Sequence, residues 1–222
     1  MTGEPIRVVL VDDQELFRAG VAVHLDAQPD MTVVGQAANG HEGVSLVQRL
    51  EPDVVLMDIR MPEMDGVEAT RQLFLPQAAA RRSRSLRVIV LTTFNLDDRA
   101  ATAIRYGASG FLLKDATPDF LRAAIRTVHA GNAVLAPDDL GLLLDGSLGT
   151  SKPPPPKAYS TLTDKEREIL GLVASGLSNA EIAESVFLSE STVKTHVGAV
   201  LRKLGLRDRV QVVVFAHDHG LR

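Results

Sequence analysis

The first 130 residues alternate between short apolar runs and segments whose apolar residues recur at helical spacing, and the alternation repeats five times. We expect the apolar runs to be strands, at residues 6–13, 32–37, 54–58, 87–94 and 109–115. The expected helices after them are residues 14–27, 41–50, 66–75, 97–106 and 117–130. This pattern predicts an α/β domain: a doubly wound, flavodoxin-like (βα)5 parallel sheet with helices on both faces and right-handed crossovers.

The character of the chain changes after residue 131. Four consecutive prolines at residues 153–156 favour an extended, semi-rigid segment. We therefore predict a first domain at residues 1–131, a Pro-rich linker at residues 132–158 and a second domain at residues 159–222. Within the linker, residues 137–146 could form a short helix.

The second domain has no strand pattern and is expected to be a small all-α domain. Helix starts are indicated by Thr163 with Glu166 as a capping box, by Ser178 or Asn179, by Ser189 and by Asp208. These signals predict four helices, the second and third separated by a tight turn.

Composition excludes several classes of protein. The chain has no cysteine, so it forms no disulfides and uses no thiolate chemistry. No apolar run approaches the length of a membrane span, and no signal-peptide pattern precedes the first strand. These features predict a cytoplasmic protein without a membrane partner.

Charge is distributed unevenly. The net charge is −4, yet residues 160–222 hold eight basic and eight acidic residues, so the excess acid lies before them. A basic cluster in this part has Asp208 as its one acid and consists of Lys194, Arg202, Lys203, Arg207 and Arg209. Such a stripe is typical of a solvated helix face and also of a surface that contacts nucleic-acid phosphates.

Polar side chains stand at the ends of four predicted strands. Asp12 and Asp13 follow the first, Asp58 ends the third, and Thr92 and Lys114 end the fourth and fifth. In a doubly wound sheet these ends face one edge, so the side chains would converge. Clustered carboxylates need a cation, and oxygen ligands suit Mg²⁺. An aspartate beside Mg²⁺ can attack a phosphoryl group to form an acyl phosphate, whose charge Lys114 would pair.

The segments LVDD, MDIRMPEMDG, VLTTF and GFLLKD resemble, in order and spacing, the receiver domain of two-component response regulators. The resemblance implies that Asp58 accepts a phosphoryl group from a sensor histidine kinase. It implies a Mg²⁺ site formed by Asp13, Asp58 and the Arg60 carbonyl, with Asp12 nearby. It also implies a switch made of Thr92, Lys114 and Phe111, although Phe111 could equally be a simple core residue. No enzymatic activity beyond phosphorylation and dephosphorylation of Asp58 itself is implied.

Two features depart from this family pattern. Receivers often have a proline in a cis peptide after the lysine, whereas this chain has Asp115. The stretch from Pro76 to Arg87 is longer than expected and carries four arginines. These arginines could belong to a solvated loop, or they could contact a partner or DNA.

The helix after Ser189 has an apolar face and an opposite face of small polar residues. The outer face consists of Ser191, Thr195, Gly198 and Arg202, with Lys194 on its flank. Residues 162–209 resemble the LuxR-type helix-turn-helix of the NarL/FixJ subfamily, which implies that this helix enters the major groove of promoter DNA. By position, Lys194, Thr195 and Gly198 would face bases, and Lys203 and Arg207 would contact phosphates.

The last helix is more apolar than one buried face requires. Val210, Val213 and Val214 are expected to face inward, which would leave Val212 or Phe215 for a partner. The resemblance implies that this helix forms the dimer that binds DNA.

These inferences combine into a phosphorylation-dependent transcriptional regulator that binds promoter DNA as a homodimer, with RNA polymerase as a further candidate partner. Three alternatives stay open. A phosphate-independent DNA binder would bind promoters without Asp58. A Mg²⁺-dependent aspartyl-phosphate phosphatase or transferase should carry a substrate-capping insertion, which this sequence lacks. A flavodoxin-like cofactor carrier would need a phosphate-cradling loop where the chain has Asp12-Asp13-Gln14.

Overall fold

The computed structural model describes residues 4–93, 98–132 and 153–221. The chain divides into two compact units, Met1–Leu135 and Ala136–Arg222, and each is described by itself.

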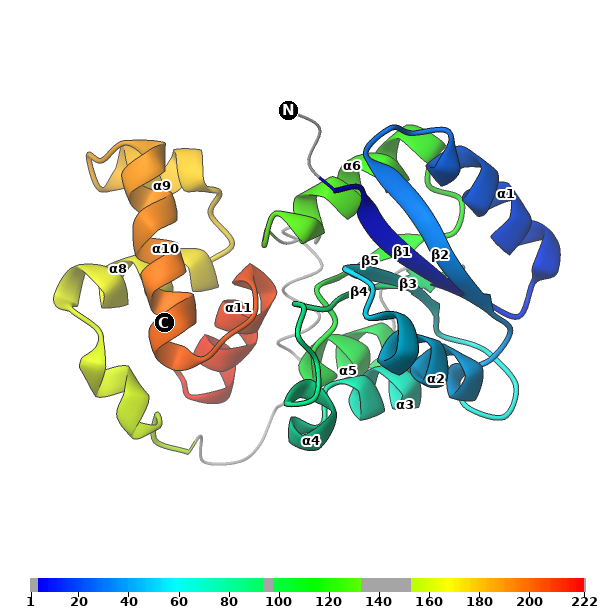
Figure 1. Cartoon of the computed structure of the whole chain (residues 1–222). Coiled ribbons are helices and arrows are strands. Elements are labelled where there is room, and N and C mark those ends of the chain that lie inside the picture. Colours follow the sequence, from blue (N-terminus) through cyan, green and yellow to red (C-terminus); the bar gives the residue numbers. More distant parts are fainter. Residues whose placement is uncertain (1–3, 94–97, 133–152, 222) are drawn as a thin grey trace. The chain divides into compact units, whose positions relative to one another are not determined.

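The first unit is built on a five-stranded parallel sheet (Figure 1). Its strands are β1 (Ile6–Val11), β2 (Met31–Ala37), β3 (Val54–Asp58), β4 (Arg87–Thr92) and β5 (Gly110–Leu113). They lie in the order β2-β1-β3-β4-β5, so the direction of winding reverses after β2 and β3 occupies the centre. The predicted doubly wound sheet is therefore confirmed.

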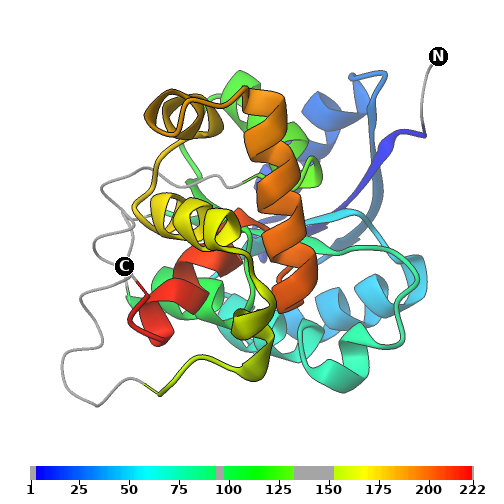
Figure 2. The same ribbon diagram turned by 90° about the vertical axis from the view of Figure 1, so that its left-hand side faces the viewer.

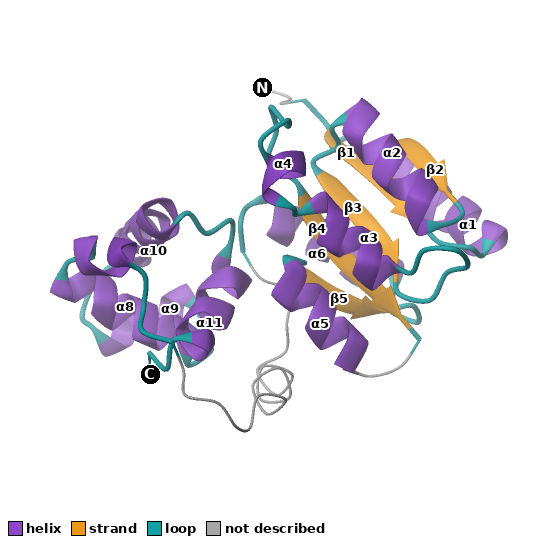
Figure 3. Ribbon diagram, turned by 90° about the horizontal axis from the view of Figure 1, so that it is seen from below, coloured by secondary structure: helices purple, strands orange, loops and turns teal. Residues whose placement is uncertain are grey.

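Helices cover both faces of this sheet. They are α1 (Glu15–Asp26), α2 (Gly40–Leu50), α3 (Gly66–Leu73), α4 (Pro76–Ala79), α5 (Asp98–Tyr106) and α6 (Pro118–His129). Helices α1 and α6 lie on one face, and α2, α3 and α5 lie side by side on the other, where Figure 3 shows them in front of the strands. The first residue of the helix expected at 97–106 lies outside the described residues, and α5 is described from Asp98.

The central strand is buried along its whole length because helices cover both sides of it. Successive side chains alternate between the two faces. Val54 and Leu56 join the core with Leu25 of α1 and Ile125 of α6. A strand buried in this way has little freedom to shift, so it provides a rigid support for Asp58 at its end.

The long connection before β4 is fastened to the rest of the first unit. It contains the one-turn helix α4, which the sequence did not predict. The Arg84 guanidinium pairs with Glu4 at 2.9 Å and with Asp53 at 3.5 Å. Arg82 donates to the Leu73 carbonyl and lies over the Phe74 ring. These internal contacts give two of the four arginines a structural role, and a partner contact stays an untested alternative.

The second unit is entirely helical among its described residues. It consists of a 3-10 helix η1 (Lys157–Thr161), α8 (Asp164–Ala174), α9 (Asn179–Ser185), α10 (Glu190–Leu204) and α11 (Arg209–Asp218). Figure 2 shows the long helix α10 beside α8. The predicted helix starts are confirmed at Thr163, Ser178, Ser189 and Asp208, and Asn179 is the first residue of α9 rather than its cap.

The boundary of the second unit differs slightly from the prediction. The helix η1 was not predicted, and its Tyr159 packs against the hydrophobic core of the second unit. The helix η1 begins at Lys157, two residues before the predicted start of the second domain at residue 159. The predicted helix at 137–146 lies outside the described residues. Within the described residues, no helix is long and apolar enough to cross a membrane.

Candidate functional site

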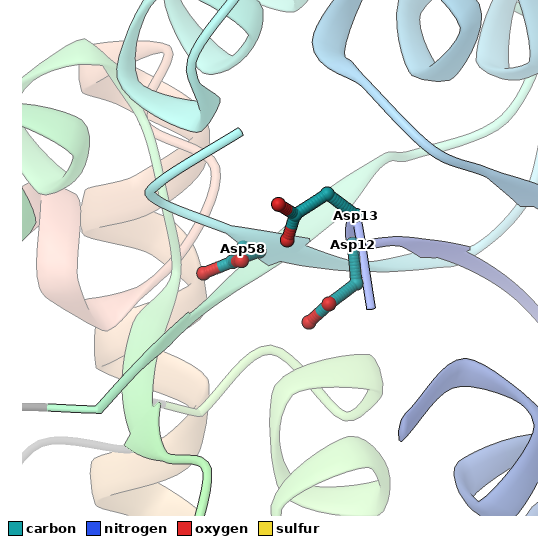
Figure 4. Close-up of side chains that lie close together, drawn as sticks. All are labelled: Asp12, Asp13 and Asp58. Carbon is teal, nitrogen blue, oxygen red and sulfur yellow. The ribbon is translucent and has the colours of Figure 1, made fainter. Parts of the chain in front are cut away.

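The carboxyl edge of the sheet brings the predicted acidic residues together. Asp12 and Asp13 follow β1, and Asp58 is the last residue of the neighbouring strand β3. Figure 4 shows their side chains gathered at this edge, and one carboxylate oxygen from each lies within 4.8 Å of the others. Asp12 and Asp58 are buried, whereas Asp13 is exposed. The cluster therefore has a buried floor and one side open to solvent.

Lys114 lies directly against the two buried carboxylates. Its Nζ is 2.7 Å from Oδ2 of Asp12 and 2.8 Å from Oδ2 of Asp58. Burial by itself would lower the pKa of Lys114, but its hydrogen bonds to the two carboxylates outweigh burial, and the net shift is upward. For Asp58, burial raises the pKa, and the contacts with Lys114 only partly offset this effect. The ammonium thus contributes most to stabilising the ionised form of Asp58, and the backbone amide of Arg60 contributes less.

The backbone around Asp58 is held in a narrow space. The amide of Ile59 donates to the Leu91 carbonyl at 3.2 Å, and the amide of Gly66 donates to the Ile59 carbonyl at 2.9 Å. A Cβ at Gly66 would lie 1.9 Å from the carbonyl oxygen of Asp58. Only glycine permits this approach of α3 to β3. Sequence reasoning treated Gly66 simply as a helix start, and nothing local in the sequence marks the contact.

Thr92 and Phe111 occupy the positions expected from the sequence. Leu91 pairs with Asp58 in the register of β4 with β3, so Thr92 stands one residue beyond the phosphoacceptor candidate. Both Thr92 and Phe111 are buried. The backbone amide of Lys114 donates to the Thr92 carbonyl at 2.8 Å. The placement is compatible with the predicted switch, and the switching itself stays a prediction.

Helix α1 contributes two neighbours that the sequence did not reveal. The Phe17 ring centroid lies 5.1 Å from the Lys114 ammonium, within the range of a cation–π contact. The Arg18 guanidinium donates to the Asp12 carbonyl. The helical spacing around these residues predicted α1, but only the tertiary packing of the first unit brings Phe17 to the lysine.

The donor atoms at this edge fit a small divalent cation. They are carboxylate oxygens, which Mg²⁺ prefers, and the exposed Asp13 leaves room for the waters that Mg²⁺ retains. The backbone amide of Arg60 is 3.4 Å from Oδ1 of Asp58, which holds the start of the following loop close to the acids. A Mg²⁺ site with Asp12, Asp13, Asp58 and the Arg60 carbonyl as ligands or neighbours remains a prediction.

Among the described residues no peptide bond is cis, and the bond after Lys114 is trans. The family's cis-proline feature is therefore absent where Asp115 replaces proline.

The outer face of α10 is exposed as predicted. Ser191, Lys194, Thr195, Gly198 and Arg202 are exposed, whereas Val193 and Val200 are buried in the domain core. The Thr195 hydroxyl donates to the Ser191 carbonyl at 2.9 Å. Helix α9, a short turn and α10 form the predicted helix-turn-helix, with this face of α10 exposed.

The two dimerisation candidates of α11 differ in their burial. Val212 is completely buried in the core of its own domain, so the hypothesis that its side chain is left for a dimer partner is wrong. Phe215 is partly buried and packs near Tyr159 and His219.

The Lys203 ammonium is bound to Glu166 within the domain, at 2.6 Å from Oε2. Arg207 is half-buried. The DNA contacts expected of Lys203 and Arg207 are untested.

The fold and the site together define a class of protein: a receiver-type α/β domain, with an acidic cluster and a lysine at the carboxyl edge, followed by a helix-turn-helix domain. Known families agree with this assignment. Residues 8–126 match the family described as "Response regulator receiver domain". Residues 160–216 match the family "Bacterial regulatory proteins, luxR family".

Full-length relatives place the chain more narrowly. It is 41% identical over 216 residues to the transcriptional regulatory protein LiaR of Bacillus subtilis (strain 168), covering 97% of this chain and 99% of LiaR. It is 38% identical over 218 residues to the nitrate/nitrite response regulator protein NarL of Escherichia coli (strain K12), covering 98% of each chain. The crystal structure of the response regulator ChrA of a heme-sensing two-component system matches with a TM-score of 0.51 and 34% identity, over 99% of this chain and all of ChrA. The chain belongs to the two-component response regulators with a LuxR-type DNA-binding domain.

Both family resemblances inferred from the sequence are therefore confirmed, and so is regulation of transcription as the general role.

Proposed function

We propose that this response regulator is switched by phosphorylation of Asp58, that the donor is a sensor histidine kinase, and that the phosphorylated chain binds promoter DNA as a homodimer. Apart from this reaction on its own Asp58, the chain catalyses nothing in this proposal. One observation carries it: the Lys114 ammonium lies within 2.8 Å of both buried carboxylates, beside a third that is open to solvent.

The chemistry of the transfer follows from these side chains. An ionised oxygen of Asp58 attacks phosphorus, the P–N bond of the phosphohistidine breaks, and its electron pair returns to the imidazole. Lys114 stabilises the ionised carboxylate before the attack and then pairs with the added phosphoryl charge. A Mg²⁺ ion held by Asp12, Asp13, Asp58 and the Arg60 carbonyl would neutralise charge on the transferring group.

The same charge provides the signal. A phosphoryl group adds negative charge and hydrogen-bond acceptors at the end of β3. The Thr92 hydroxyl is the nearest candidate donor on β4, and its movement would give Phe111 room to repack. Such a local event biases a surface with two alternative states, which then favours dimerisation. A two-fold dimer presents two copies of α10 to an inverted repeat, and RNA polymerase stays a candidate partner at the promoter.

The first prediction concerns phosphoryl uptake. After incubation with Mg²⁺ and acetyl phosphate, intact-protein mass spectrometry should detect one added phosphoryl group on the wild type and none on Asp58→Asn. The matched control is Asp119→Asn, which removes an exposed carboxylate at the start of α6 and should be phosphorylated like the wild type. An equal adduct on Asp58→Asn would show that another residue accepts the group and would contradict the proposal.

A DNA-binding measurement distinguishes this proposal from the alternative that the chain binds DNA independently of phosphorylation. The probe is a duplex that the phosphorylated wild type enriches from a random pool. Acetyl phosphate should tighten binding of this duplex by the wild type and by Asp119→Asn, with no effect on Asp58→Asn. Equal binding by all three proteins with and without the donor would favour the phosphate-independent alternative.

A further inference from the structure

The Lys203 ammonium, in the last turn of α10, is surrounded by acceptors from its own domain. Its Nζ lies 2.6 Å from Oε2 and 2.9 Å from Oε1 of Glu166, and 3.2 Å from the carbonyl oxygen of Thr161. A lysine ammonium has three N–H donors and no acceptor. Three protein oxygens therefore occupy the ammonium, and a DNA phosphate would have to displace one of them.

Glu166 is itself held in place and nearly buried, with 8% of its side chain exposed. Its carboxylate accepts a hydrogen bond at 2.7 Å from the backbone amide of Thr163, as part of the capping box that begins α8. The hydrogen bonds from Lys203 and from Thr163 keep the pKa of Glu166 below its ordinary value. A buried carboxylate that caps one helix and binds the end of another is costly to leave without its cation.

This group of contacts joins three elements. Thr161 ends η1, Glu166 lies in the first turn of α8, and Lys203 lies in the last turn of α10. Lys194 and Arg202 lie on the same helix and are exposed. Within the part of the chain that the structure describes, neither side chain forms an ion pair or a hydrogen bond. Lys203 is therefore set apart from these two exposed residues of the basic cluster, and it shares its internal bonding with Arg209, which donates to Asn179 and to the Leu177 carbonyl.

We propose that Lys203 is a positioning residue for DNA recognition: with Glu166 it clamps the end of α10 against the start of α8, and it makes no phosphate contact. The inference rests on the proposed DNA-binding role of α10. Lys203 acts on DNA only through the helix it anchors. The phosphate-contacting charge then comes from other basic residues of the cluster.

A double-mutant cycle distinguishes a clamp from a phosphate contact. The proteins are the full-length wild type, Lys203→Met, Glu166→Gln and the double variant, and the probe is the duplex enriched by the phosphorylated wild type. With a clamp, either single change weakens binding roughly tenfold, and Lys203→Met costs less than about twofold in the Glu166→Gln background. With a phosphate contact, Glu166→Gln alone tightens binding because it frees the ammonium, and Lys203→Met therefore costs more in the Glu166→Gln background than in the wild type.

The salt dependence of binding provides a second readout that helix packing alone does not change. Removing a phosphate contact lowers the slope of log affinity against log salt concentration by about 0.9. The clamp predicts an unchanged slope for Lys203→Met, and a slope reduced by that amount would overturn it. The matched controls are Lys165→Met and Glu168→Gln, which break an exposed ion pair on α8 and should leave binding unchanged.

Two measurements without DNA complete the test. In ¹⁵N-labelled wild type, the Lys203 ammonium should give a slowly exchanging signal that Glu166→Gln abolishes, and Lys203→Met should accelerate amide exchange in the last turn of α10. Absence of both effects would overturn the clamp. If the wild type enriches no duplex, the proposed DNA-binding function fails, and these two measurements still decide whether the clamp exists. Circular dichroism confirms that each variant is folded.

Discussion

Gly66→Ala should destabilise the receiver domain by about 3 kcal/mol or more. The added methyl group would lie 1.9 Å from the carbonyl oxygen of Asp58 and 3.0 Å from Cγ of Met57, so it overlaps backbone that cannot rotate away. Relief requires that α3 move off β3, and β3 is buried on both faces. Because the clash is with the phosphoacceptor candidate itself, phosphoryl uptake should fall together with stability.

Gly20→Ala is the matched control for this substitution. Gly20 is an exposed residue inside α1, and a Cβ there would meet no atom within 4 Å. Alanine is the better helix former, so this change should stabilise the domain by about 0.5–1 kcal/mol. The free energy of unfolding can be obtained for the receiver alone from hydrogen exchange of β1 and β3 amides. A loss below about 1 kcal/mol for Gly66→Ala would contradict the packing argument.

Lys114→Met should cost about 3 kcal/mol of receiver stability at neutral pH in the absence of divalent cations. The substitution leaves the carboxylates of Asp12 and Asp58, which are both buried, next to each other without their shared cation. The matched control is Arg126→Met, which breaks an exposed ion pair with Asp30 and should cost less than about 1 kcal/mol.

The loss caused by Lys114→Met should depend on pH in a defined direction. Burial already raises the pKa of Asp58, and the variant removes the contacts with Lys114 that lower it, so the folded-state pKa rises further. A carboxyl group whose pKa is higher in the folded than in the unfolded state binds more protons when folded. Relative to the wild type, the variant should therefore gain stability as the pH falls through the folded-state pKa of Asp58 toward the ordinary pKa of a carboxyl group, and lose that gain as the pH rises through the folded-state pKa.

Magnesium should act in the same direction as acid. An ion that binds only the folded acidic cluster stabilises it by mass action, and the variant gains more because no ammonium competes for the same oxygens. Hydrogen exchange of β1 and β3 at neutral and mildly acidic pH, with and without Mg²⁺, measures both effects. If neither acid nor Mg²⁺ reduces the loss of stability caused by Lys114→Met, then Lys114 stabilises the domain by packing rather than by charge.

Local sequence was sufficient for most of the architecture. Continuous apolar runs located the strands, helical spacing of apolar residues located the helices, and cap residues such as Thr163 and Ser189 marked helix starts. These signals depend on neighbouring residues only. The acidic cluster was also predictable, since parallel strands necessarily bring Asp12, Asp58 and Lys114 to one edge. For the last helix the prediction was wrong, because apolar residues surround α11 and periodicity cannot indicate which side is buried. Val212 was therefore assigned to the wrong side.

What the sequence determined by itself was the order of the elements, the two domains and the identity of the charged groups at the sheet edge. Only the tertiary structure decided which charged side chains are already paired within the protein, and at which positions a residue larger than glycine does not fit. Lys203 lies 37 residues from Glu166, and Gly66 meets the Asp58 carbonyl only after α3 has packed on β3. Such contacts depend on distances between elements, and those distances are determined by the packing of the whole domain rather than by residue type or local spacing.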